Sequence, residues 1–307
     1  MKNICFVVFA VAAISLSFLL LLSGCGVLPF ASGNSGESPI PGINAENYPR
    51  IDASTANMPL LAQLYSELVG VTLEEAQTMV SVSGGTGAVW RNIMWEGGAD
   101  LLIAYEAPEP VMRDIKEAGV DLEITPVGRD GLVFLVHKSN PIESLTTEQL
   151  RDIYTGTITD WSEVGGTPGA ISPFQRNAES GSQTLFLKLL MDGTEPASPA
   201  SELVPGSMGG LMEAVASFDG SGGAIGYSVY YYADLMYANP DLKLLSVDDV
   251  APTTGSIKSG EYPLINDFYL VLRADSPEGS PARLIRDWLL TDKGAALMER
   301  ANYVSVR

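Results

Sequence analysis

Near its middle the chain reads Phe174-Gln-Arg-Asn-Ala-Glu-Ser-Gly-Ser-Gln-Thr-Leu-Phe186. A strand-like run over residues 171–174 leads through a turn into an apolar helix, which the spacing predicts over 183–191. Ser180-Gly181-Ser182 stands where this helix opens, and serine is a favoured residue at helix starts. The stretch therefore predicts a strand, a turn and a helix, as in an α/β protein.

The start of this helix has the chemistry of an oxyanion site. Either Ser180 or Ser182 can cap the helix, and Gly181 lets the backbone approach a ligand closely. The free N–H groups of the first turn carry partial positive charge. Arg176 can place a bidentate guanidinium on the same spot. The alternative is an ordinary helix cap beside a surface arginine.

The rest of the chain alternates strand and helix patterns, which predicts α/β architecture with largely parallel sheets. The run over 99–105 is almost continuously apolar, as in a strand buried on both faces. Other strands are predicted over 78–82, 131–137, 224–228 and 267–272, and helices over 59–69, 89–95, 146–154, 282–290 and 293–300. Ligands of such sheets bind beyond the carboxyl ends of strands, often against helix N-termini.

The first residues have the pattern of an export signal. Lys2 precedes an almost uninterrupted apolar run over 4–22, and Leu22-Ser23-Gly24-Cys25 then places small residues before a cysteine. This ending resembles a bacterial lipoprotein signal, in which Cys25 would carry lipid and anchor the protein on the extracytoplasmic face of the cell membrane. The alternative is an uncleaved transmembrane helix, because an apolar run of this length could span a bilayer.

Composition narrows the classes of function. Cys5 and Cys25 are the only cysteines, so a lipidated chain without residues 1–24 has no thiol for a disulfide or a metal. The formal net charge of −19 argues against nucleic acid as a partner. His137 is the only histidine, which supports neither a zinc site nor a Ser-His-Asp hydrolase. The tyrosines at 230–232 are expected to pack rather than to form a ligand cage.

Arg176-x-x-x-Ser180-Gly181-Ser182 resembles the central motif of the phosphate-binding proteins of ABC phosphate transporters. There an arginine followed by Ser-Gly-Thr grips the anion, and Ser182 keeps the hydroxyl of that threonine. Other segments resemble loops and signatures of this family in the same order: Asp52-Ala-Ser-Thr-Ala-Asn-Met-Pro-Leu60, Ser83-Gly-Gly-Thr-Gly87, Gly98-Ala-Asp-Leu-Leu-Ile-Ala-Tyr-Glu-Ala-Pro108, Gly223-Ala-Ile-Gly-Tyr227 and Ile257-Lys-Ser-Gly-Glu-Tyr-Pro263. Ala53 stands where the family usually has glycine. The resemblance covers nearly the whole chain after the signal.

The resemblance implies an α/β, two-lobed, periplasmic-binding-protein-like (type II) fold with two crossing strands as the hinge. It implies a signal over 1–24, a flexible tether over 25–47, a first lobe over 48–127 plus 264–307, and a second lobe over 128–263. Inorganic phosphate would bind in the cleft between the lobes and pass to an ABC permease, without catalysis, cofactor or metal. The implied ligand-binding residues are Ser54, Thr55, Thr86, Glu106, Arg176, Ser180, Gly181 and Ser182.

Glu106 stands where the family usually has aspartate, and a carboxylate beside an anion needs a physical account. It would repel the anion unless the anion donates a proton to it. Phosphate keeps a proton near neutral pH and sulfate has none, so an acceptor at Glu106 would reject sulfate. Alternatively, Glu106 is a solvated loop acid and Asp100 has the larger role.

Two other functions stay open at this point. One is a binding protein or a sensor for a different oxyanion. The other is an exported phosphate-ester hydrolase, which the sequence disfavours because it offers no metal-ligand cluster and no placed nucleophile–base pair.

Overall fold

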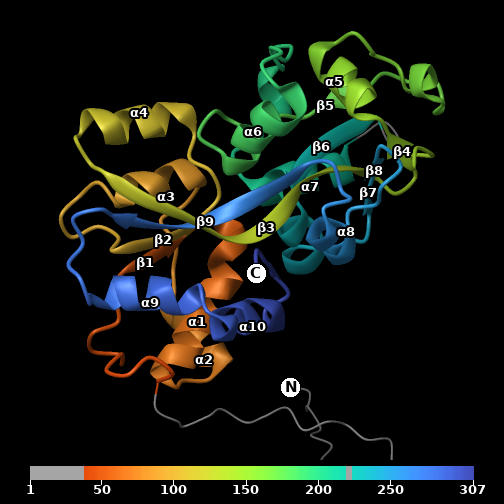
Figure 1. Cartoon of the computed structure of the whole chain (residues 1–307). Helices are drawn as coiled ribbons and strands as arrows, with labels where there is room; N and C mark the ends of the chain where they lie inside the picture. Colours follow the sequence, from red (N-terminus) through yellow and green to blue (C-terminus); the bar gives the residue numbers. More distant parts are fainter. Residues whose placement is uncertain (1–37, 219–222) are drawn as a thin grey trace, which may run out of the picture. The chain divides into compact units, whose positions relative to one another are not determined.

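The computed structural model describes residues 38–218 and 223–307, which fold into two lobes joined by long strands (Figure 1). The predicted signal and Cys25 lie outside the described residues. Within the described part, no helix combines the length and the apolar character that crossing a bilayer requires.

The first lobe is built on a mixed sheet. Strand β1 (Ile51–Ala53) pairs in parallel with β2 (Leu101–Ala104), whereas β2 pairs antiparallel with β9 (Ile265–Arg273). Strand β9 pairs antiparallel with the first part of β3 (Leu122–His137), which also pairs with β10 (Val304–Ser305). The helices of this lobe are α1 (Met58–Val69), α2 (Leu73–Met79), α3 (Thr86–Asn92), α4 (Glu109–Glu117), α9 (Pro281–Leu289) and α10 (Asp292–Arg300).

Helices cover both faces of this sheet, and β2 shows why it is apolar throughout. Successive side chains of a strand point to opposite faces. Leu102 belongs to the core cluster formed with α3 and α4, whereas Leu101 and Ile103 belong to the cluster that includes α1, α9 and α10. Figure 1 shows α3 and α4 on one side of the sheet and α1, α9 and α10 on the other.

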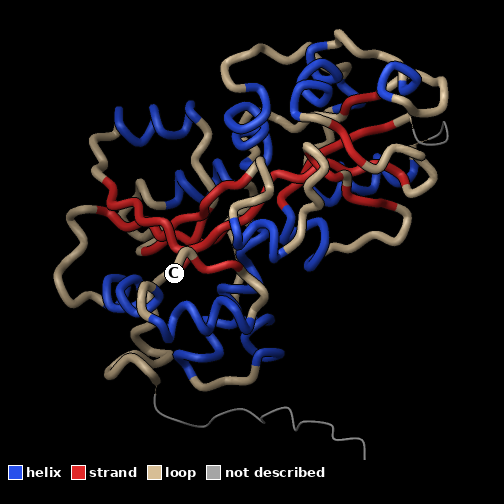
Figure 2. The backbone as a smooth tube through the Cα atoms, turned by 45° about the vertical axis from the view of Figure 1, so that its right-hand side comes forward, coloured by secondary structure: helices blue, strands red, loops and turns tan. Residues whose placement is uncertain are grey.

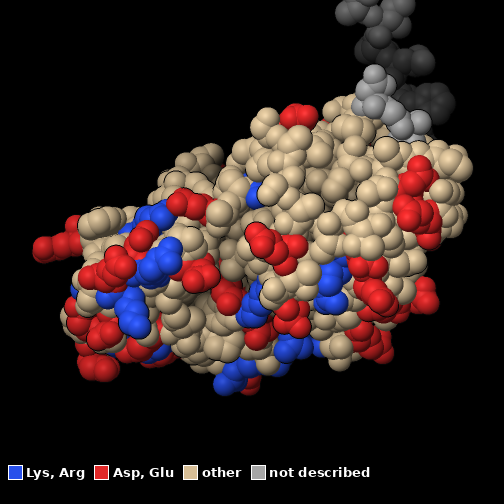
Figure 3. Space-filling model, turned by 90° about the horizontal axis from the view of Figure 1, so that it is seen from above, with Lys and Arg blue, Asp and Glu red and all other residues tan. Residues whose placement is uncertain are grey.

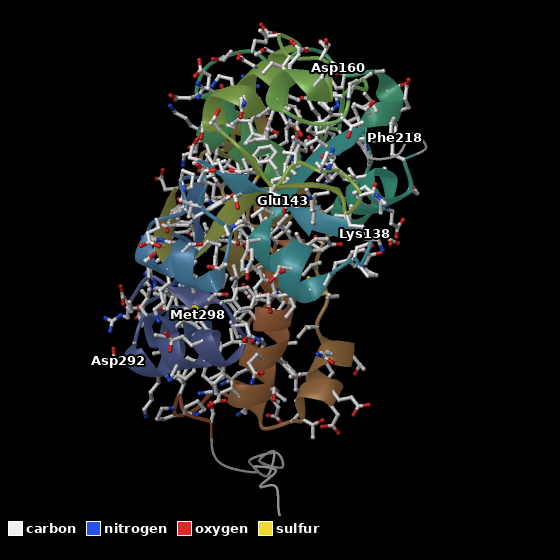
Figure 4. The ribbon with its side chains drawn as sticks, turned by 90° about the vertical axis from the view of Figure 1, so that its right-hand side faces the viewer. Lys138, Glu143, Asp160, Phe218, Asp292 and Met298 are labelled. Carbon is white, nitrogen blue, oxygen red and sulfur yellow. The ribbon has the colours of Figure 1, made fainter. Side chains whose placement is uncertain are left out.

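The second lobe is built on the last part of β3. That part pairs antiparallel with β6 (Ala224–Val229) and β7 (Leu242–Leu244), and β6 pairs in parallel with β5 (Ser172–Pro173). A small parallel pair joins β4 (Ser144–Leu145) to β8 (Ser246–Val247). The helices are α5 (Thr147–Thr155), α6 (Gly181–Leu185), α7 (Met208–Ser217) and α8 (Thr254–Ser259). Figure 4 labels Asp160 and Phe218 in this lobe and Asp292 and Met298 in the first.

Strand β3 is shared by the two lobes. Its residues 122–131 pair with β9, and its residues 132–136 pair with β6. Leu132 donates its backbone N–H to the carbonyl of Leu264 at 2.8 Å, directly before β9 begins. Figure 2 shows the strands passing from one lobe to the other with helices on both sides. The change of partner falls a few residues after the predicted lobe boundary at 127/128, which stays a prediction.

Most predicted elements are confirmed, some with shifted ends. The helix predicted over 146–154 is α5, which begins at a capping box in which Thr146 accepts from the backbone N–H of Gln149 at 3.1 Å. The strands predicted over 131–137, 224–228 and 267–272 lie in β3, β6 and β9. The helix predicted over 89–95 is α3, which starts and ends a few residues earlier.

Two predictions are wrong. The sheets are not largely parallel, because β3 pairs antiparallel with each of its neighbours β6, β7, β9 and β10. The strand predicted over 78–82 is absent, because α2 begins at a capping box of Thr72 with Glu75 and runs to Met79. Val80, at the end of that helix, takes an extended conformation.

The end of the predicted tether belongs to the body. Ile40 and Ile43 are 6% and 4% exposed and lie in the main core cluster. A turn follows them, in which Asn44 and Asn47 exchange backbone-to-side-chain hydrogen bonds. Burying two isoleucines offsets the cost of ordering this segment, so the packed body starts before the predicted residue 48.

Candidate functional site

A cavity of about 40 Å³ lies between the lobes and collects most of the predicted site residues. The first lobe contributes Ser54, Thr55, Ala56, Gly85, Thr86 and Tyr105, and the second contributes Arg176, Ser180, Gly181, Ser182, Met208 and Val229. Seven of the eight residues that the sequence predicts are thus brought together. Glu106 is the exception.

Of the helices that begin at this cavity, three have no side-chain cap among the described residues. Their N-cap residues are Ser54 before the short helix Thr55–Asn57, Gly85 before α3, and Ser180 before α6. The first N–H groups of a helix have no partner within it and carry partial positive charge. The cavity is therefore surrounded by donors that favour a negative ligand.

The serines at these starts are engaged with other groups instead of capping. Ser180 is the N-cap residue of α6, as expected, but its Oγ lies 3.0 Å from Ser182 Oγ and makes no cap hydrogen bond. In the first lobe, Ser54 Oγ accepts from the backbone N–H of Tyr105 at 3.2 Å and lies 3.5 Å from Thr86 Oγ1. Each hydroxyl thus stays at the cavity, where it can turn toward a ligand.

Arg176 is buried at the cavity without a counter-ion among the described residues. It is 9% exposed, and its Nε donates to the carbonyl of Pro205 at 3.1 Å. Its Nη2 donates to the carbonyl of Gly206 at 3.4 Å, whereas Nη1 has no hydrogen-bond partner. Burial lowers the pKa of Arg176, and the nearby Tyr227 and Tyr232 partly oppose this effect.

An anion in the cavity would change this energy balance. Removing a guanidinium from water is costly, and the cost is recovered only through hydrogen bonds and an opposite charge. The carbonyl acceptors fix two of the nitrogens of Arg176 and leave Nη1 to a ligand. Arginine stays charged even when buried, so the geometry favours an oxyanion at this point.

The backbone of Arg176 is held by two residues that the sequence interpretation did not assign to the site. Its N–H donates to Tyr227 Oη and to Gln183 Oε1, both at 3.0 Å. The Tyr227 hydroxyl also donates to Gln183, and its ring stacks on Phe186 at 4.6 Å. Tyr227 closes the Gly-Ala-Ile-Gly-Tyr segment of β6, and Gln183 directly follows Ser182, so both lie in stretches that the sequence had marked.

Tyr105, Gly85, Ala56, Met208 and Val229 also line the cavity and were not predicted. Tyr105 could have been inferred, because it stands next to Glu106 in the same segment. Met208 is the first residue of α7, and nothing in its local sequence points to a ligand.

The lobes touch each other around the cavity. The N–H of Gly87 in α3 donates to the carbonyl of Glu179 in the second lobe at 3.1 Å. Arg91 of α3 holds the Glu179 carboxylate with two hydrogen bonds of 2.9 Å. A Cβ atom added to Gly181 would lie 2.4 Å from Thr86 Oγ1, so glycine avoids a clash where the lobes meet.

Both carboxylates considered from the sequence are paired elsewhere. The Glu106 carboxylate, 35% exposed, forms an ion pair with Lys188 and does not line the cavity. Asp100 accepts from Arg50 Nη2 at 2.8 Å and Nε at 3.1 Å. No carboxylate therefore lines the cavity as the described residues form it, and the proton-acceptor role expected for Glu106 has no support in this geometry.

Charge over the rest of the body does not attract an anion. Figure 3 shows acidic and basic side chains interspersed on the face seen from above. With a net charge of −19, attraction of an anion must come from the local donors and Arg176. Among the described residues, no group of three or more His, Cys, Asp or Glu side chains could hold a metal ion.

The aromatic run outside the cavity packs as expected. Tyr230, Tyr231 and Tyr232 are 7–8% exposed. Tyr231 stacks on Tyr303 with ring centroids 3.7 Å apart. His137 ends β3, where its Nδ1 lies 2.7 Å from Ser139 Oγ.

Comparison with known proteins places the chain in the PBP superfamily. Residues 51–290 match the model of the PBP superfamily domain. The phosphate-binding protein PstS of Bacillus subtilis is 28% identical over 259 residues, which span 81% of this chain and 80% of that protein. The resemblance to the phosphate-binding proteins of ABC transporters is thus confirmed.

Two solved structures have the same fold. A substrate-binding protein with bound phosphate from Clostridium perfringens has a TM-score of 0.63 at 24% identity, and the match covers 85% of this chain and 100% of that one. An ABC-type phosphate transport receptor from Vibrio cholerae has a TM-score of 0.58 at 23% identity, with 83% and 98% covered. The two-lobed α/β fold predicted from the sequence is confirmed.

Proposed function

Because the chain belongs to the PBP superfamily, we propose that it is a solute-binding protein that captures inorganic phosphate between its lobes and delivers it to an ABC permease. The proposed ligand-binding residues are Ser54, Thr55 and Thr86 of the first lobe and Arg176, Ser180, Gly181 and Ser182 of the second. The proposed lobes are residues 48–127 plus 264–307, onto which the buried Ile40 and Ile43 pack from the preceding segment, and residues 128–263.

The observation that carries this proposal is the buried, uncompensated guanidinium of Arg176. Arg176 lines a cavity at which three uncapped helices start, and its Nη1 has no hydrogen-bond partner among the described residues. Such a set of donors suits a tetrahedral oxyanion, which presents acceptors in several directions. Phosphate is the ligand named for the relatives in Bacillus subtilis and Clostridium perfringens.

The size of the cavity favours an inorganic anion over a phosphate ester. A volume of about 40 Å³ has room for only a few atoms. An ester would need further space for its organic group, and the contacts of Gly87 and Arg91 with Glu179 hold the lobes together beside the cavity. The relatives named above are binding and transport proteins, which also favours binding without catalysis.

Calorimetric titration of the full-length protein tests the proposal. We expect phosphate and arsenate to bind with one anion per chain. Both anions are tetrahedral, and the charged side chain that lines the cavity is the cation Arg176. In the same preparation, a chromogenic phosphate ester should release no dye. Hydrolysis of the ester, or absence of heat with every oxyanion tried, would contradict a phosphate-binding role.

We propose further that Cys25 is lipidated and holds the protein at the outer face of the membrane, since Leu22-Ser23-Gly24-Cys25 has the form of a lipoprotein signal. Cys25→Ser is expected to release the protein from membranes or to leave its signal uncleaved. Cell fractionation and mass spectrometry of the N-terminus measure this. Cys5→Ser, within the predicted signal, serves as the control. A Cys25→Ser protein that still carries lipid would contradict the anchor.

A further inference from the structure

Glu106 and Lys188 form an ion pair across the cleft. Glu106 follows Tyr105, which lines the cavity from the first lobe. Lys188 lies in the π-helical continuation of α6, Phe186–Met191, in the second lobe. Helix α6 begins at the cavity with Gly181, and lysine side chains in a helix lean back toward its N-terminus. The pair thus bridges the two lobes outside the cavity lining, with Glu106 next in sequence to the lining residue Tyr105.

Lys188 keeps its charge in this position. Burial lowers the pKa of Lys188, but the hydrogen bond and charge of Glu106 outweigh this effect and leave the pKa above its ordinary value. Asp267 and Tyr269 of β9 also face this region, and Asp267 is itself paired with Arg129 at 3.4 Å. Lys188 is therefore the cation that the Glu106 carboxylate contacts, among the ion pairs of the described residues.

We propose that Lys188 is a specificity-determining residue, which holds the Glu106 carboxylate away from the cavity and so lets the site accept fully ionised oxyanions such as sulfate together with phosphate. This inference rests on the proposed function. It concerns which oxyanions the same cavity takes, and it identifies a residue outside the cavity lining as the determinant.

The groups that line the cavity do not distinguish a protonated from a fully ionised oxyanion. The described lining offers hydroxyl groups, backbone N–H groups and Arg176, and it contains no carboxylate. An anion bound there meets no carboxylate to which it would have to donate a proton. Sulfate and hydrogen phosphate carry the same charge and have the same tetrahedral arrangement of oxygens, so such a site has little means of separating them.

Removing Lys188 would change this balance. Glu106 would keep its negative charge next to Tyr105 without a partner across the cleft. A carboxylate near a desolvated site repels an anion that has no proton to donate, whereas it can accept a hydrogen bond from phosphate. Sulfate should therefore lose more affinity than phosphate.

Competition titrations of phosphate against sulfate test this on the full-length protein. We expect dissociation constants within about tenfold of each other for the wild type, because equal charge and shape leave less than about 1.4 kcal/mol between them. In Lys188→Met the ratio should shift against sulfate by at least about tenfold. Lys188→Arg keeps the ion pair and should keep the wild-type ratio, as should the double variant Lys188→Met/Glu106→Gln, which has no charge to release.

A second Lys–Glu pair supplies the matched control. Lys243 pairs with Glu143 in the second lobe, and neither lines the cavity (Figure 4 labels Glu143). Lys243→Met should therefore leave the ratio unchanged. Lys188 is 48% exposed, so its replacement should not disturb folding; Lys188→Gln provides a second test if the melting temperature of Lys188→Met falls.

Each outcome bears on the inference. An unchanged ratio in both Lys188→Met and Lys188→Gln would overturn it, as would a shift that persists in the double variant. A wild type that already rejects sulfate by about a hundredfold or more would show that Glu106 acts despite Lys188. If no variant binds either anion, the proposed function itself fails, which is a result distinct from a wrong selectivity.

Discussion

Replacing Arg176 with alanine is expected to weaken phosphate binding by about 2–5 kcal/mol, in line with the loss of one partner of a buried charge pair. Among the residues that line the cavity, Arg176 is the one with a formal charge. Its Nη1 has no partner in the described structure, so a bound anion would be its counter-ion. Without the arginine, the remaining donors are neutral and bind an anion much more weakly.

Calorimetry with phosphate measures this loss of affinity, and two further variants show whether it comes from the charge and shape of Arg176. Arg176→Lys keeps a charge but cannot reproduce the fork that contacts Pro205, Gly206 and the cavity, so it should recover only part of the affinity. Arg129→Ala removes an arginine that is paired with Asp267 away from the cavity and should change phosphate affinity little.

The stability of the ligand-free Arg176→Ala protein gives an independent check. The guanidinium is buried and has no counter-ion in the part of the chain that the structure describes, so its removal should not lower the melting temperature measured without phosphate. A folded alanine variant with unchanged phosphate affinity would exclude Arg176 from the site.

Gly181→Ala is expected to weaken phosphate binding by about 1–3 kcal/mol, the usual cost of an inserted methyl group in a packed contact. The new Cβ would lie 2.4 Å from Thr86 Oγ1 and 3.2 Å from Thr86 Cβ. Gly181 and Thr86 belong to opposite lobes, so the clash would act against the closed arrangement in which both line the cavity. Each lobe taken alone has room for the methyl group, so the melting temperature without ligand should change little.

A double-mutant cycle with Thr86→Ala separates this clash from other effects. Thr86→Ala alone should weaken binding through the loss of one hydroxyl donor, by about 1 kcal/mol. Because it also removes the oxygen that the new methyl group would meet, Gly181→Ala should cost less in the Thr86→Ala background than in the wild type. Gly169→Ala, where the nearest atom is 4.0 Å away, is the neutral control. Strictly additive losses would mean that the two lobes do not meet at this contact.

Local features of the chain were predictable because their causes lie within a few residues. The turn and helix start of Ser180-Gly181-Ser182, with Arg176 just before it, depend on capping preferences and on the small size of glycine. Thr146 begins α5 through a contact with Gln149, three residues on. The continuously apolar run of β2 is typical of a strand that is buried on both faces. These patterns, with the family resemblance, led to the two-lobed fold and to seven of the cavity residues.

The remaining features depend on residues that are distant in sequence. The direction of strand pairing is set by how the two lobes connect through β3 and β9. Hydrophobic runs do not encode this direction, because a strand buried on both faces has the same pattern in parallel and in antiparallel sheets. Tyr227 reaches the backbone of Arg176 from β6, 51 residues further along the chain.

The surroundings of Glu106 also depend on a residue that is distant in sequence. Its position in the sequence indicated a residue at the ligand, but its partner Lys188 lies 82 residues away in the other lobe. An ion pair forms between whichever opposite charges the fold brings within reach, and its strength falls off over a few ångströms. The sequence by itself determined which groups are available to bind an anion, and the tertiary structure decided that, among the described residues, Arg176 is left without a counter-ion while Glu106 has one.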